Sequence, residues 1–415
     1  MNIRRLVTPT VFALALLLAV AACSPKRILP QGATTQQAAN FEALYKSQMP
    51  WQYEQWKQSP HGKAGVTCIN CHDPGPDGKI KPENLDTLAF GGVQPGRCGK
   101  CHEKEFAGWS QTRHSEAVKL ATGNVRYKLL DGFPAMQRQG CQSCHFKVGT
   151  TCISCHDAHS FQPPKTAKAV NDACGMCHNG PDHPQKEVQE TGVHLRQAEA
   201  SALGTTGMQE PNCVTCHTMD DNKHYIFRIK GVQADASLNV KANNRQLLEV
   251  KCWKCHTHEF AAAALKDSDA IKAEGARIVD AGRAIVRDLY AEGILKPSYG
   301  SLLDDKGVPL LNATGTSYSH VSEIESLMFE LFKFAEATTD RGAQHFSPDY
   351  VHWHGNADLW AKYLAIRGEA IHLRWEHEGN GVPIEQFEQE LVARKPVYTM
   401  YAYTNQTGHE LDGLK

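Results

Sequence analysis

The residues best suited to do chemistry in this chain are cysteines and histidines, which recur at one fixed spacing. The sequence holds 15 cysteines and 21 histidines. All the cysteines except Cys23 fall into Cys-x-x-Cys-His motifs. In chain order, and numbered here from first to seventh, the motifs are Cys68–His72, Cys98–His102, Cys141–His145, Cys152–His156, Cys174–His178, Cys213–His217 and Cys252–His256.

This spacing is typical of covalent haem attachment. Two thiols three positions apart can form thioethers with the vinyl groups of one haem, and the next histidine can then bind the iron. The expected attachment residues are Cys68, Cys71, Cys98, Cys101, Cys141, Cys144, Cys152, Cys155, Cys174, Cys177, Cys213, Cys216, Cys252 and Cys255. The expected proximal ligands are His72, His102, His145, His156, His178, His217 and His256. Zinc sites or redox disulfides would not keep that histidine every time, so we predict seven c-type haems.

An electron-transfer haem needs a second axial ligand, whereas a catalytic haem keeps one face of its iron open. Several histidines outside the motifs lie in short polar segments, as in "QSPHG" and "QTRHS". The predicted distal ligands are His61, His114, His159, His194, His224 and, from "YVHWHG", either His352 or His354, with His354 preferred. Six distal ligands for seven haems would leave one iron open to a substrate.

The chain is too short to give each haem a separate globin-like pocket, because 415 residues must surround all of them. We therefore predict a mainly α multihaem cytochrome c with a haem-packed, loop-rich N-terminal part. After Cys255 there are no more cysteines, and apolar residues recur at helical spacing over 272–293, 319–337 and 356–373. These segments predict long C-terminal helices that pack as a bundle. The predicted domains are a haem domain over 51–260 and a helical domain over 261–415.

The N-terminus has the pattern of an export signal. Arg4 and Arg5 precede the apolar run "VFALALLLAV", and "VAAC" ends at Cys23. We predict a lipoprotein signal peptide over 1–22, lipidation of Cys23 and a flexible tether over 23–50; the alternative is an ordinary signal peptide with a chance cysteine. The protein would then be exported to the periplasm or outer membrane. The 44 basic and 45 acidic residues give no sign of a nucleic-acid partner.

The neighbourhoods of these motifs resemble the hydroxylamine oxidoreductase family of multihaem cytochromes. The matching phrases include "QWKQSPHGKAGVTCINCHD", "CGMCHNGPDHPQKEVQETGVH" and "HFSPDYVHWHG", over roughly residues 50 to 370. Members of that family typically carry eight haems, form trimers and act on small nitrogen compounds. Here the family's first motif is absent, so the resemblance implies a seven-haem variant and a homo-oligomer, with the electronic link between subunits in question.

The resemblance also implies roles for individual residues. The catalytic haem would be the one held by Cys141 and Cys144, with His145 as its proximal ligand. Asp182 and His183 of "GPDHP" would supply acid/base groups on its distal side, where proton transfer accompanies electron transfer. From residue chemistry alone, the preferred interpretation of "GPDHP" is a polar turn between helices, and the resemblance reverses that preference.

Oxidative members of the family also carry a tyrosine cross-linked to the catalytic haem. Tyr350 is the candidate here, and Tyr398, Tyr401 and Tyr403 are the alternatives.

The motifs and the resemblance together are compatible with three functions. The preferred one is oxidation of hydroxylamine (or hydrazine) at the open haem, with electrons passing through six bis-histidine haems to a partner cytochrome or a membrane quinone complex. The second is reduction of nitrite or hydroxylamine to ammonium. The third is an electron-transfer conduit that has no substrate.

Overall fold

The computed structural model describes residues 27–72, 93–124, 127–128, 130–196, 211–227, 244–297 and 322–379. Helices dominate these ranges, and the strand-like pairings found there are two isolated bridges, Ile28–Val66 and Thr218–Ile226. The prediction of a mainly α protein is therefore confirmed. No helix in the described ranges combines the length and the apolar character needed to cross a membrane.

The chain divides into two compact units, each built from several segments. Unit 1 comprises Met1–Val118, His145–Lys165 and Asp221–Tyr225, and unit 2 comprises Lys119–Cys144, Thr166–Asp220 and Ile226–Lys415. The division does not follow the domain boundary predicted at residue 260. Unit 2 combines the fifth to seventh motifs with the C-terminal helices because Pro181 and Thr191 bond to residues of those helices: the Pro181 carbonyl accepts from Thr338 and Thr191 pairs with Ser347.

Unit 1 consists of short helices that carry or flank the first, second and fourth motifs. They are α2 (Thr35–Gln48), α3 (Pro50–Gln58), α4 (Pro60–Lys63), α5 (Cys68–Cys71), α7 (Pro95–Gly99), α8 (Glu103–Ser110) and the 3₁₀ turn η2 (Cys152–Ser154). Thr34 starts α2 with a capping box, and Phe41 and Tyr45 of this helix are buried against Cys68 and Ile69. The predicted tether over 23–50 is thus folded from residue 35 onward.

Two helices each contain a point at which the chain passes from one unit to the other. They are α9 (Ala117–Thr122) and α12 (Gln142–Thr150), which carries most of the third motif.

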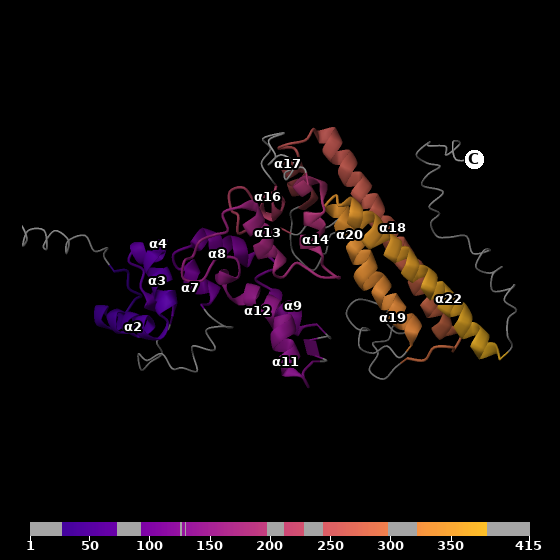
Figure 1. The fold of residues 1–415 in the computed structure, drawn as a ribbon, viewed down its shortest axis with the longest axis horizontal. Helices are drawn as coiled ribbons and strands as arrows, with labels where there is room; N and C mark the ends of the chain where they lie inside the picture. The colour runs from indigo at the N-terminus through magenta and orange to yellow at the C-terminus, as the bar shows by residue number, and fades with distance from the viewer. Residues whose placement is uncertain are drawn as a thin grey trace, which may run out of the picture. The chain divides into compact units, whose positions relative to one another are not determined.

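Unit 2 contains the remaining short elements and a bundle of long helices. The short elements are α11 (Pro134–Met136), η1 (Gln137–Cys141), α13 (Ala167–Gly175), α14 (Gln185–Glu190), α16 (Cys213–His217) and α17 (Asn244–Cys252). The C-terminal elements are α18 (His258–Ala291), α19 (Glu323–Glu330), η4 (Leu331–Ala335), α20 (Glu336–Gln344), α21 (Pro348–Val351), η5 (His352–Ala357) and α22 (Asp358–Glu378). In Figure 1, α18 and α22 run side by side, with α19 and α20 along them.

The core of the bundle explains why the sequence folds this way. Apolar residues at helical spacing on α18, α19 and α22 meet in one buried cluster that includes Ile278, Leu289, Ile324, Met328 and Ile366. All of these are at most 1% exposed. Burial of each side chain of this size contributes about 1.5–3 kcal/mol. The three helical segments predicted after Cys255 are confirmed.

Candidate haem sites and catalytic centre

The backbone of the attachment motifs forms one helical turn, as hydrogen bonds within several of them show. The amide of the motif histidine donates to the carbonyl of the first cysteine in the first, second, fifth and seventh motifs, over 2.9, 2.9, 3.0 and 2.9 Å. Residues three and four positions apart lie on one helix face. The turn therefore presents both thiols and the imidazole on the same side, as covalent attachment of a haem requires. Capping boxes at Thr67 and Asn212 start the turns of the first and sixth motifs.

In unit 1, three motif histidines each face a second histidine. The ring centroids are 6.1 Å apart for His72 and His159, and 5.8 Å apart for His102 and His61. His156 and His224 are also 5.8 Å apart, and their Nε2 atoms approach to 3.5 Å. Two imidazoles that bind one metal at about 2 Å each hold their nitrogens about 4 Å apart. The Nε2 separation of His156 and His224 is close to this value, and the other two pairs have similar distances between ring centroids. All three are therefore candidate pairs of axial ligands on one iron.

Unit 2 contains two more such pairs. The ring centroids of His256 and His194 are 6.1 Å apart, and those of His217 and His345 are 6.3 Å apart. His345 was not among the predicted ligands. It is the C-terminal cap of α20, and burial lowers its pKa to about 4, so it is neutral at physiological pH. Its Nδ1 lies 2.8 Å from the Arg341 carbonyl, which leaves Nε2 for a metal.

The other predicted histidines differ from these pairs. His145 is exposed on α12, and among the described residues no second imidazole faces its ring. His114 lies just before α9, and burial lowers its pKa. His354 lies in η5, where its ring stacks on Tyr350 at 5.1 Å and its Nδ1 is 2.9 Å from Asp349. His354 was predicted as a distal ligand, but the C-terminal histidine that faces a motif histidine is His345.

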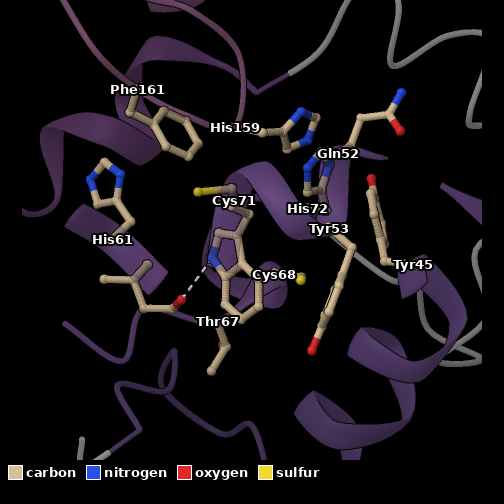
Figure 2. A pocket seen from close by; sticks show the side chains of 12 residues that line it. Tyr45, Gln52, Tyr53, His61, Thr67, Cys68, Cys71, His72, His159 and Phe161 are labelled. Atoms are coloured by element: carbon tan, nitrogen blue, oxygen red, sulfur yellow. Dashed lines mark hydrogen bonds between the residues drawn. The ribbon is translucent and has the colours of Figure 1, made fainter. Parts of the chain in front are cut away.

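The first motif lines a cavity of about 380 Å³, including its part open to solvent. Figure 2 shows Cys68 and Cys71 in this cavity with His72 and His159, and Phe161 as one of its aromatic walls. Pockets for small molecules and cofactors are lined mostly by apolar and aromatic side chains. The Nδ1 atoms of His61 and His72 are buried without a hydrogen-bond partner. Two thiols, two neutral imidazoles and an apolar wall are a donor set that fits a haem.

The thiols of neighbouring motifs lie close together, which relates the haem sites within each unit. A hydrogen bond with the Cys152 thiol lowers the pKa of Cys98 to about 7. Burial raises the pKa of Cys71, and the nearby Cys98 adds to the effect. In unit 2, Cys174 bonds to Cys213 in the same way.

Burial raises the pKa of Cys216 to about 11, and the nearby Cys252 adds to the effect. The sites of the first, second and fourth motifs are therefore adjacent in unit 1, and those of the fifth, sixth and seventh in unit 2.

Asp182 and His183 are in contact, as a proton-transfer pair requires. An oxygen of the Asp182 carboxylate is 2.9 Å from His183 Nδ1, and the other is 2.5 Å from the Lys333 ammonium. Burial favours the neutral acid, but His183 and Lys333 outweigh it and hold the pKa of Asp182 well below its usual range. Asp182 is therefore ionised at neutral pH. Its carboxylate accepts a hydrogen bond from His183 Nδ1, so that His183 Nε2 is left to exchange protons.

Lys333 was missed at the sequence level, although it interrupts the otherwise apolar run "LFKFA". It lies in the π-helical turn η4. Two further π turns in the described part of the chain, η1 and η5, contain Cys141 and His354. Single π turns within α-helices occur frequently at functional sites. Three of them thus coincide with candidate site residues.

Tyr350 lies on α21, half-buried beside Glu187 and Asp349. Burial raises its pKa, and the two carboxylates add to the effect. Its backbone approaches Gly342 so closely that a Cβ there would lie 2.7 Å from the Tyr350 carbonyl carbon. Tyr398, Tyr401 and Tyr403 lie outside the described residues.

The comparisons with known proteins agree with this geometry. Residues 64–300 match the family model described as "Seven times multi-haem cytochrome CxxCH". The chain belongs to the multihaem cytochrome family. Its Cys-x-x-Cys-His motifs are therefore sites for covalently bound c-type haems, and electron transfer is the activity that these haems support.

Two curated relatives share part of their sequence with the chain. It is 23% identical over 444 residues to the "Probable nitrite reductase-hydroxylamine oxidoreductase fusion protein" of Kuenenia stuttgartiensis, covering 85% of this chain and 49% of that protein. It is also 23% identical to the C-type polyheme cytochrome OmcB of Geobacter sulfurreducens, covering 68% of this chain and 41% of that one. The chain thus spans about half or less of the length of these curated relatives.

Solved structures share the fold. A reducing HAO-like protein complex of Kuenenia stuttgartiensis matches with a TM-score of 0.64 at 19% identity, covering 85% of this chain and 89% of that one. A "Hypothetical multiheme protein" matches with a TM-score of 0.61 at 16% identity, covering 87% and 98%. The similarity to hydroxylamine oxidoreductase-like proteins that the motifs indicated is therefore found by sequence comparison and by fold comparison alike.

Proposed function

We propose that the chain is a seven-haem oxidoreductase in which the haem of the third motif reacts with a small nitrogen compound and six bis-histidine haems conduct electrons. The observation that carries this is a difference between motif histidines. Five of them face a second imidazole at about the separation of two axial ligands, whereas none of the described residues faces His145 with an imidazole. His114 stays the predicted sixth distal ligand, without assignment to a particular haem.

Bound to Cys141, Cys144 and His145, a haem would supply a redox-active iron with one accessible face. The chain would supply the protons. Asp182, ionised beside Lys333, orients His183 so that Nε2 can give or take the proton that accompanies each electron. The adjacent haem sites of each unit give the electrons a route along closely spaced centres.

Two directions of reaction are supported by different observations. Oxidation of hydroxylamine (or hydrazine) is the first candidate, because Tyr350 is available as the tyrosine that oxidative relatives link to their catalytic haem. Reduction of nitrite or hydroxylamine to ammonium is the second, because a solved structure with this fold is a reducing HAO-like protein complex. The redox partner would be a cytochrome or a membrane quinone complex.

Electron paramagnetic resonance of the purified holoprotein tests the proposal. We expect one high-spin ferric haem among seven, and hydroxylamine oxidation with a cytochrome acceptor or nitrite reduction with a chemical reductant. Seven low-spin haems and no turnover in either assay would contradict the proposal and favour an electron-transfer conduit that has no substrate. A spectral change of the catalytic haem in Tyr350→Phe would support oxidation, and an unchanged spectrum would remove that role of Tyr350.

We also propose export and membrane anchoring through a lipid on Cys23, and a homo-oligomer, which is a trimer in the family. Cys23 and the segment 1–22 lie outside the described residues. A Cys23→Ala variant should appear in the soluble periplasmic fraction, whereas the unchanged chain should fractionate with membranes. Light scattering of the holoprotein gives the number of subunits.

A further inference from the structure

An ion-pair cluster joins the sixth and seventh motifs in unit 2. Asp220, three residues after His217, places one carboxylate oxygen 2.6 Å from Lys251 Nζ and the other 2.5 Å from Lys254 Nζ. Lys251 immediately precedes the seventh motif and Lys254 lies inside it. Each oxygen of a single carboxylate therefore binds a lysine beside the next haem site.

The three charged groups are buried to different extents, and the most buried one, Lys251, needs Asp220 as its counter-charge. The Lys251 side chain is only 5% exposed, whereas those of Lys254 and Asp220 are 47% and 53% exposed. A buried ammonium without a counter-charge is strongly unfavourable. Exposed ion pairs contribute little by themselves, so the pair with Lys251 is the one that fixes the geometry.

We propose that Asp220 is a positioning residue for electron transfer between the sixth and seventh haem sites. It holds the segment after His217 against the segment that carries Cys252 and Cys255. It also offsets the positive charge of two lysines next to these haems. Because a nearby positive charge favours the reduced haem, Asp220 keeps the reduction potentials of this pair lower than the lysines alone would.

The test is a redox titration of holoprotein with Asp220→Asn, followed by optical spectra resolved haem by haem. Loss of the carboxylate leaves the lysines uncompensated, so the potentials of two haems should rise, by about tenfold in the reduction equilibrium, which is about 59 mV for one electron. The matched control is Asp221→Asn. This exposed neighbour changes the net charge equally and makes no ion pair within the described residues.

Lys254→Gln guards against a fold defect, because it removes the exposed partner and leaves the pair with Lys251 intact. It should lower the same two potentials, and the double variant should depart from the sum of the single shifts because the groups interact. Equal shifts in Asp220→Asn and Asp221→Asn would overturn the proposal, as would additive shifts in the double variant. These results do not depend on whether the third-motif haem turns over a substrate.

Discussion

His345 faces His217 with 6.3 Å between ring centroids, although one ends α20 and the other ends the sixth motif. This pair connects the long C-terminal helices directly to a haem site. The helices therefore do more than pack beside the cytochrome part of the chain, since one of them supplies a candidate iron ligand.

Replacement of His345 by Ala should convert the sixth-motif haem from low spin to high spin, because the iron loses its second imidazole. Electron paramagnetic resonance would show one additional high-spin signal. His354→Ala is the matched control, since that ring stacks on Tyr350 and should leave the spin count unchanged. A new high-spin signal in His354→Ala and none in His345→Ala would instead identify His354 as the ligand.

The third-motif haem should be the one that binds external ligands. In a Cys141→Ser, Cys144→Ser double variant, the mass should fall by one haem, and the absorbance change on adding cyanide should disappear. The equivalent change at Cys252 and Cys255 should also remove one haem but keep cyanide binding. Cyanide binding that survives the first double variant would move the open site to another motif.

Lys333→Met should lower turnover about 10- to 100-fold, because Asp182 loses the charge that keeps it ionised and His183 loses its fixed orientation. The haem spectrum should stay unchanged, because Lys333 is not a predicted ligand. Lys362→Met is the control: Lys362 also pairs with a carboxylate of the bundle, that of Glu330. Equal activity losses in the two variants would assign Lys333 a structural role alone.

The depressed pKa of Asp182 predicts how stability depends on pH. Its folded pKa lies below the unfolded value of about 3.9, so the carboxylate stabilises the fold above that pH and stops doing so as pH falls through the folded pKa. Asp182→Asn should therefore unfold at lower denaturant than the parent chain at pH 6 to 7, and the gap should narrow below about pH 4. A gap that is constant with pH would contradict ionisation of Asp182 as its cause.

Ile366 tests the bundle core. It is fully buried on α22, so Ile366→Ala should destabilise the protein by about 2–5 kcal/mol. Leu364, on the same helix, is 49% exposed, and Leu364→Ala should change stability by less than about 1 kcal/mol. Denaturant titration of the holoprotein gives both values. Similar losses in the two variants would mean that this part of α22 is packed differently.

The motifs and the helical segments could be predicted because both depend on local spacing. A Cys-x-x-Cys-His turn needs one turn of helix, and the stripe through Ile278 needs one helix face. His345 and Lys333 could not be predicted because their roles depend on contacts with residues far away in the sequence. His345 lies far along the chain from every attachment motif, and Lys333 gains its partner from a loop between α13 and α14.

If the chain is exported as proposed, the pairing of His156 with His224 has a consequence for how the protein matures. Unit 1 draws His224 from the segment Asp221–Tyr225, which follows more than fifty residues of unit 2 in the chain. A chain that enters the periplasm N-terminus first can receive its fourth haem long before this histidine arrives. The fourth haem site would then lack His224 while the rest of the chain is still being delivered.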